Sequence, residues 1–178
     1  MMYTNFKSLT LSNLLLVLLL SLSSFSYGQK NLNVVLNEKG SMKIKFSNGG
    51  FYMYISPYGK VQNYGVSGDS DVTYDFNGRI QRIGDMSLDF DFNGRIKTVG
   101  SFSISYDFHD RVQNIGSTSF SYNFDDVISS IGTKTIQYDF HDRVTSIGGT
   151  TISYGFISEK IDNVSNNDGF VIVEYEIK

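Results

Sequence analysis

The amino-acid sequence predicts an all-β protein, an antiparallel β-meander of tandem 16-residue hairpin repeats whose sheet is curled, barrel-like or two-layered. Three observations predict this class. One motif recurs every 16 residues, and Asn-Gly dipeptides separate short alternating segments. The composition is β-rich, with 12 Tyr, 14 Phe, 17 Gly, one Pro, no Trp and no Cys.

The first 28 residues are typical of a secretory signal peptide. Lys7 is their only charge, and Ser26 and Gly28 are small residues at −3 and −1 of a cut before Gln29. The apolar run at 11–20 is far shorter than the roughly 20 residues that span a bilayer. We therefore expect a protein that is secreted, periplasmic or at the cell surface, with cleavage near Gly28–Gln29 and no transmembrane span after signal removal.

Residues 29–178 are expected to form a single β-repeat domain, with regular repeats at 74–156 and irregular caps at 29–73 and 157–178. Irregular end units are typical of repeat arrays. The first cap contains three alternating segments that are typical of strands, at 32–36, 42–46 and 51–55. Residues 58–65 look like a degenerate repeat, and 170–178 are expected to include a closing strand.

Each regular repeat has an aromatic residue and a Phe two positions later, and in the first five an aliphatic residue follows six positions after the aromatic one, at Ile80, Ile96, Val112, Ile128 and Val144. The aromatic residues are Tyr74, Phe90, Tyr106, Tyr122, Tyr138 and Tyr154. The Phe residues that follow them are Phe76, Phe92, Phe108, Phe124, Phe140 and Phe156. Gly recurs at the other end of each unit, at Gly84, Gly100, Gly116, Gly132 and Gly148, so each unit is expected to be strand, turn, strand, turn.

Parity sets the length of the first turn. Facing residues of an antiparallel pair share a face, so Phe90 and Ile96 both reach the apolar face if the loop has three residues, 92–94. That loop pairs Asp91 with Arg95. The same argument across the second turn places Ile96 beside Tyr106, and Arg95 beside Asp107.

A ladder of alternating charges is therefore expected along one rim of the sheet. Its members are Asp75, Arg79, Asp91, Arg95, Asp107, Arg111, Asp139 and Arg143. The fourth unit supports pairing, because Asn123 and Val127 replace both partners together. An exposed pair contributes only about 0–1 kcal/mol, so the ladder would set register rather than stability. A merely solvated polar rim is the alternative interpretation.

The number of strands limits the architecture. We count roughly 15 to 17 short strands, and a strongly twisted open sheet rarely exceeds about 10. Each sheet also has one apolar face that must leave water. The sheet is therefore expected to curl into a barrel-like or spiral shape, or to fold back into two layers.

The segment Tyr-Asp-Phe-Asn-Gly-Arg-Ile at 74–80 resembles the YD repeat of Rhs-type proteins. The match recurs at 90–96, and with Asp in place of Gly at 106–112 and 138–144. The resemblance implies strand–turn–strand units in a sheet that spirals into a hollow shell, often around a toxin domain. It does not carry a toxin function to this chain, because the array is too short to enclose a domain.

Few residues suggest catalysis or metal binding. His109 and His141 occupy the same turn position two repeats apart, roughly 19 Å in a flat sheet, so they cannot share a metal ion. Without Cys there is no thiolate site, and no metal or cofactor is expected. Asp69 with Asp71 and Asp125 with Asp126 are interpreted as solvated turns. A net charge of −3 argues against nucleic acid as a partner.

The best candidate ligand-binding residues are aromatic. Tyr52 and Tyr54 alternate with apolar residues in the segment 51–55, and Tyr58 and Tyr64 follow nearby. This strand is either covered on both faces or offers its tyrosines to a ligand. The leading hypothesis is thus a non-catalytic secreted or cell-surface binding or scaffold module, with a cell-surface protein or carbohydrate as partner.

Two other functions are kept as alternatives. A secreted carboxylate-dependent glycan hydrolase would use Glu174 and Glu176, which share one face of the last segment. A small apolar-ligand carrier would require that the meander close around a cavity. Oligomeric state is left open.

Overall fold

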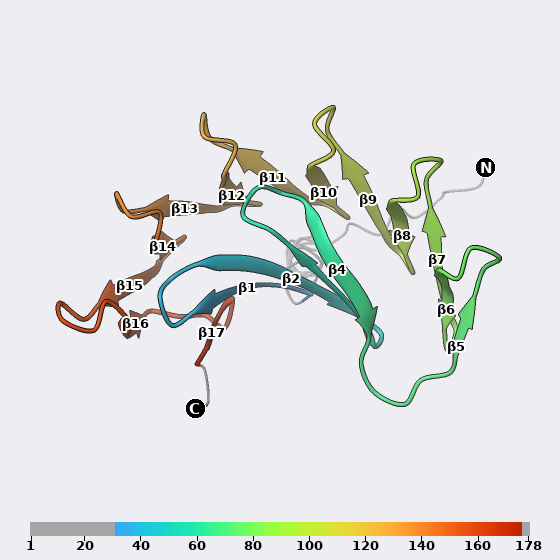
Figure 1. The fold of residues 1–178 in the computed structure, drawn as a ribbon, viewed down its shortest axis with the longest axis horizontal. Helices are drawn as coiled ribbons and strands as arrows, with labels where there is room; N and C mark the ends of the chain where they lie inside the picture. The colour runs from blue at the N-terminus through green and yellow to red at the C-terminus, as the bar shows by residue number, and fades with distance from the viewer. Residues whose placement is uncertain (1–30, 176–178) are drawn as a thin grey trace, which may run out of the picture.

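The computed structural model describes residues 31–175, and this part of the chain contains 17 strands and no helix. The strands form two open sheets stacked as two layers (Figure 1). The predicted all-β meander is confirmed, and of the predicted shapes the two-layered one is adopted. The predicted signal peptide and Glu176 lie outside the described residues.

The smaller, inner sheet has five strands in the order β17-β1-β2-β3-β4. Their bounds are β1 Leu32–Asn37, β2 Met42–Asn48, β3 Phe51–Ile55, β4 Val61–Val66 and β17 Val171–Glu174. β1 to β4 are successive antiparallel hairpins. β17 pairs in parallel with β1, with Val34 opposite Val171, so both ends of the described chain meet in one sheet.

The outer sheet has twelve strands, all antiparallel to their neighbours in sequence order from β5 to β16. It bends as an arc around one face of the inner sheet (Figure 1). The strands come in six hairpins, and their bounds are β5 Val72–Tyr74, β6 Ile80–Ile83, β7 Met86–Phe90, β8 Ile96–Val99, β9 Phe102–Tyr106, β10 Val112–Ile115, β11 Thr118–Tyr122, β12 Ile128–Ile131, β13 Lys134–Tyr138, β14 Val144–Ile147, β15 Thr150–Tyr154 and β16 Ile161–Ser165.

The loops inside the first five outer hairpins follow the parity argument. In β7–β8 the Asp91 N–H donates to the Arg95 carbonyl at 2.8 Å, which leaves three residues in the loop, whereas the last hairpin has a four-residue loop, 156–159. The third residue of the three-residue loops has a left-handed backbone, at φ 78° in Gly94 and 58° in Asp110. Glycine, and next to it Asp, tolerate this conformation. The inner loops 37–41 and 56–60 have the same hydrogen-bond pattern.

The second turn differs from the prediction. Val99 faces Phe102, so the turn has two residues, Gly100 and Ser101, and Gly100 has φ 58°. An even loop reverses parity, and a β-bulge restores it because Phe90 faces Ile96 while Asp89 faces Thr98. The predicted pairing of Ile96 with Tyr106 is therefore wrong. The paired residues of β8 and β9 are Thr98 with Ser103 and Val99 with Phe102.

The bulge explains the spacing of the core residues. In the second strand of the first five outer hairpins the first and fourth residues are both buried, as Ile96 and Val99 are, although a regular strand would point them to opposite faces. They pack against buried Phe46, Phe51 and Met53 of the inner sheet. The Phe46 ring meets that of Phe102 across the layers at 5.4 Å between centroids. One continuous core therefore joins the two sheets.

The inner loops also bond the outer hairpins directly. The N–H of the first residue in the second strand of an outer hairpin donates to an inner-loop carbonyl in four successive hairpins. The bonds are Val112 to Gly59 at 2.8 Å, Ile128 to Pro57 at 2.8 Å, Val144 to Gly40 at 3.2 Å and Ile161 to Glu38 at 2.7 Å. Each inner loop thus inserts between two outer hairpins and fixes the layers in register.

Candidate functional site

Six highly exposed Phe side chains form a row along one edge of the molecule. Each lies at the tip of an outer hairpin loop, and their exposed fractions run from 89% for Phe108 to 109% for Phe76, while Ile157 beside the last of them is 94% exposed. The six loops project outward around the arc of the outer sheet (Figure 1). We call this row the phenylalanine rim, and it consists of Phe76, Phe92, Phe108, Phe124, Phe140 and Phe156.

The loop geometry explains this exposure. The Phe is the first loop residue, just beyond the last backbone bond of the hairpin, so neither sheet covers its ring. A polar side chain follows it in the first five units, as Asn93 follows Phe92, and Ile157 follows Phe156 in the last. Where that residue is His, the two rings lie together, at 3.8 Å between centroids for Phe108 and His109. Five of the six tips therefore offer an aromatic ring beside a hydrogen-bonding group.

The Asp that opens each loop holds the tip in place. Asp91 Oδ1 accepts the N–H groups of Asn93 and Arg95 at 2.9 Å, and Asp91 Oδ2 accepts from Arg95 Nε at 2.7 Å. The same contacts recur in the units of Asp75, Asp107 and Asp139. Hydrogen bonds from the Arg79 side chain and backbone lower the pKa of the Asp75 carboxyl. The loops are thus fixed turns that present their Phe at constant positions.

The charge ladder forms within loops, but its links between units differ from the prediction. Arg95 contacts Asp110 rather than Asp107, and Arg111 contacts Asp126 at 2.6 Å. The second acid therefore comes from the left-handed loop position of the next unit, which sequence reasoning did not assign to the ladder. In the fourth unit Asn123 replaces Asp, and its Oδ1 still accepts the N–H of Val127 at 2.9 Å.

In four of the outer hairpins a tyrosine links the hairpin to the preceding one. The Tyr106 hydroxyl donates to the carbonyl of Ile96, ten residues earlier, at 2.9 Å, and Arg95 stacks on the Tyr106 ring at 4.4 Å. The bond recurs for Tyr122, Tyr138 and Tyr154 at 2.5 to 2.7 Å. Burial raises the pKa of Tyr106 to about 12, so the hydroxyl keeps its proton at neutral pH.

The four tyrosines that the sequence singled out are not brought together. Tyr52 and Tyr54 are half-buried and alternate in β3 with residues of the core between the sheets, so they lie on the other face of the inner sheet, with ring centroids 5.7 Å apart. Tyr64 packs against Phe51 and Phe90 between the layers. Tyr58 alone is at the rim side, exposed in the inner loop 56–60.

A pocket of about 580 Å³ opens beside the rim. It lies where the inner loops meet the outer loops that carry Phe124 and Phe140. Its lining includes Tyr58, Asp125, Tyr138 and Asp142. The pocket therefore adds carboxylate groups and a tyrosine next to the exposed rings.

Groups for catalysis or metal binding are sparse in residues 31–175. They contain no cluster of three or more His, Cys, Asp or Glu side chains that could hold a metal ion. Glu174 pairs with Lys43 at 2.8 Å on the inner sheet. None of these residues forms a helix long and apolar enough to span a membrane.

The sequence was compared with protein-family models and with curated proteins. No protein-family model and no curated protein matches this chain. What the observations define is a two-layer β-hairpin repeat protein with an exposed aromatic rim.

The sequence analysis did not predict the phenylalanine rim, because it used each of these Phe residues only to define the repeat. The parity argument already placed Phe92 in the loop. An apolar residue at one loop position in all six units is the signal that could have identified a surface, since hairpin loops usually carry polar residues.

Proposed function

We propose that this chain is an exported, non-catalytic binding module that holds a carbohydrate polymer on its phenylalanine rim. The observation that supports the proposal is the full exposure of six Phe rings, one at every outer loop tip. A water-exposed apolar row of this kind is stabilised when a partner covers it, and such patches commonly mark binding sites.

The neighbours of the rings favour a sugar polymer. The C–H face of a sugar ring packs against the negative face of an aromatic ring, while its hydroxyls bond polar groups alongside. Asn77, Asn93, His109, Asp125 and His141 supply those groups directly after the first five Phe residues of the rim. Adjacent tips are separated by two strands, roughly 10 Å within the sheet, so a polymer with regularly repeated rings meets equivalent contacts along the row.

The charge of the rim argues against an anionic membrane as the partner. The loops carry Asp110, Asp126 and Asp142 at their left-handed positions, and all three are exposed. Their carboxylates repel acidic headgroups. Export through the predicted signal peptide would bring the rim into contact with cell-surface or extracellular polysaccharides.

The proposal is tested by sedimentation with insoluble cellulose, chitin and peptidoglycan. We expect the protein to bind one of these, and the triple variant Phe108→Ser, Phe124→Ser and Phe140→Ser to lose about tenfold or more in affinity, since burying even part of three Phe rings contributes several times RT. The bound polymer should keep its chain length.

A matched control places three substitutions in the same hairpins at the opposite edge. Ser101→Ala, Ser117→Ala and Thr133→Ala lie in the two-residue turns and should leave binding unchanged. Circular dichroism and melting temperature verify the fold of both triple variants. Equal binding by the two variants, or sedimentation only with lipid vesicles, would refute the carbohydrate rim.

A further inference from the structure

The outer hairpins repeat a docking position that the inner loops fill only in part. In the hairpins from β9–β10 to β15–β16, the N–H of the first residue of the second strand donates to an inner-loop carbonyl. Ile96 occupies the equivalent position in β7–β8, and it forms no such bond to the inner sheet in the described part of the chain. The hairpin β7–β8 therefore repeats a docking position that accepts an inner-loop carbonyl in four other hairpins, but no inner loop occupies it here.

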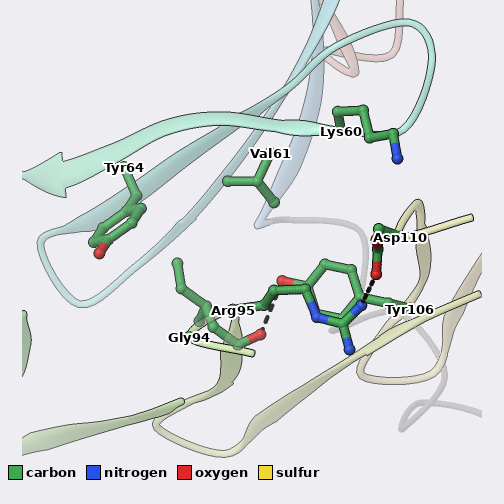
Figure 2. Close-up of a pocket in the computed structure, with 8 residues that line it drawn as sticks. Lys60, Val61, Tyr64, Gly94, Arg95, Tyr106 and Asp110 are labelled. Atoms are coloured by element: carbon green, nitrogen blue, oxygen red, sulfur yellow. Dashed lines mark hydrogen bonds and ion pairs between the residues drawn. The ribbon is translucent and has the colours of Figure 1, made fainter. Parts of the chain in front are cut away.

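A pocket of about 250 Å³ lies at this unfilled position. Figure 2 shows Lys60, Val61 and Tyr64 of the inner sheet on one side, and Arg95 and Tyr106 of the outer sheet on the other. Ile96 and Gly94 complete the outer wall. The pocket is thus the space that lies beyond Gly59, the inner-loop residue that fills the next position along.

The charged groups around the pocket are already paired. The Lys60 ammonium donates to the carbonyl of His109, and Arg95 is held by Asp91 and Asp110. The Tyr106 hydroxyl donates to the Ile96 carbonyl at 2.9 Å. The Ile96 N–H stands where its four counterparts donate to inner-loop carbonyls, and no inner-loop carbonyl accepts it in residues 31–175. A carbonyl ligand would supply that acceptor.

The paired charges indicate a neutral acceptor. A carboxylate would gain no unpaired cation here, whereas an amide carbonyl satisfies the Ile96 N–H without adding charge. Val61, Tyr64 and the Tyr106 ring provide apolar walls for the groups that flank such a carbonyl. The four filled positions show which kind of group fits, because each holds a backbone carbonyl from a tight hairpin loop.

We propose that this pocket binds a β-hairpin loop of a protein partner, whose backbone carbonyl accepts the Ile96 N–H. The inner loops 37–41 and 56–60 are the templates for the loop that fits. The site is separate from the phenylalanine rim, and it does not depend on the carbohydrate proposal.

Amide hydrogen exchange measured by NMR on the full chain tests this inference. In the free protein the Ile96 amide should exchange about fivefold faster than those of Val112, Ile128, Val144 and Ile161, because a hydrogen bond contributes about 1 kcal/mol and 1.4 kcal/mol corresponds to a factor of ten. Adding a backbone-cyclised peptide with the sequence of residues 34–44 should slow Ile96 about fivefold and leave the four filled amides unchanged.

Two variants of β4 and two small carbonyl compounds serve as controls. Val61→Phe fills the pocket and should abolish the effect of the peptide, whereas Val66→Phe at the other end of β4 should not. Free Ile96 exchanging as slowly as Val112 would overturn the proposal, as would no response to the cyclised peptide. Equal slowing by N-acetylglucosamine or acetate at the same concentration would show that the pocket recognises a small carbonyl compound only.

Discussion

At the scale of single residues, one hydroxyl group links each of four outer hairpins to the preceding one. Tyr106, Tyr122, Tyr138 and Tyr154 each donate to a carbonyl ten residues earlier. The second repeat has Phe90 instead, so the carbonyl of Ile80 has no such donor. The Phe90 ring is placed like the tyrosines, since Arg79 stacks on it at 4.4 Å.

Phe90→Tyr should therefore stabilise the fold. The added hydroxyl is positioned to reach the Ile80 carbonyl, and a hydrogen bond contributes about 0.5–1.5 kcal/mol net. Urea unfolding would show the gain as a higher midpoint with an unchanged slope. The reverse change, Tyr138→Phe, removes an existing bond of 2.7 Å and should lower the midpoint by a similar amount. A loss of stability in Phe90→Tyr would contradict this account.

Sequence reasoning reached some residue roles and missed others for identifiable reasons. The apolar side of Ile96 followed from parity, but the role of Asp110 did not, because its contact with Arg95 depends on how adjacent loops lie in space. The half-buried Tyr52 and Tyr54 looked equivalent to the exposed Tyr58 in the sequence, since alternation says nothing about which layer covers a face.

At the scale of elements, the outer loop is one structure with interchangeable residues at its left-handed position. The segments 108–112 and 140–144 have the same sequence, Phe-His-Asp-Arg-Val. Asp110 and Asp142 share the same backbone, with φ 58° and 60°. Their side-chain partners differ. Asp110 contacts Arg95 of the preceding unit, whereas the equivalent residue of the unit before Asp142 is Val127, which has no charge.

These two loops separate backbone strain from the ion pair. Asp142→Gly should stabilise by about 1 kcal/mol, because an L-residue pays roughly 1–2 kcal/mol in the left-handed region. Asp110→Gly gains the same relief but loses the bond to Arg95, so its gain should be smaller by about 0–1 kcal/mol. Urea midpoints at low and high salt measure the difference, which should shrink as salt screens the pair. Identical gains at low salt would show that the pair contributes nothing.

The hairpin loops were predictable and the two-residue turns were not. Three loop residues follow from the demand that Phe90 and Ile96 share a face. At the opposite edge an even-numbered turn shifts the alternation of faces by one residue, and the β-bulge shifts it back by one. The spacing of apolar residues is therefore the same as for a regular strand with an odd-numbered loop, so the sequence could not distinguish the two arrangements.

At the scale of the whole molecule, two closely fitted loops hold the layers together. A Cβ atom on Gly40 would overlap the hydroxyl and ring of Tyr154, and one on Gly59 would overlap Tyr122 in the same way. Both glycines also have left-handed backbones, at φ 83° and 73°. Glycine is thus required twice, for conformation and for close approach.

Gly40→Ala should destabilise the protein more than Gly78→Ala. Gly78 has a similar φ of 74° in an outer loop, but a Cβ atom there meets nothing within 4 Å. Both variants pay for the backbone, and only Gly40→Ala must displace Tyr154, which adds about 1–3 kcal/mol. Melting temperatures of the two variants measure the difference. Equal losses would mean that the inner loop is not tightly seated.

The division into two sheets could not be derived from the repeat. Strand count required curling or layering, but the segment 67–71 between the sheets resembles any other turn. The closing strand was expected at the end of the chain, yet its parallel pairing with β1 depends on contacts far apart in sequence.

That parallel pairing determines the order in which the molecule can assemble. Each outer hairpin joins neighbours only a few residues apart and can form quickly, because closing a short loop costs little entropy. The edge of β1 that faces β17 must wait for residues 171–174, more than 130 positions later. Completion of the inner sheet is therefore the late step of folding, and a chain stalled before it would leave a bare strand edge open to pairing with other molecules.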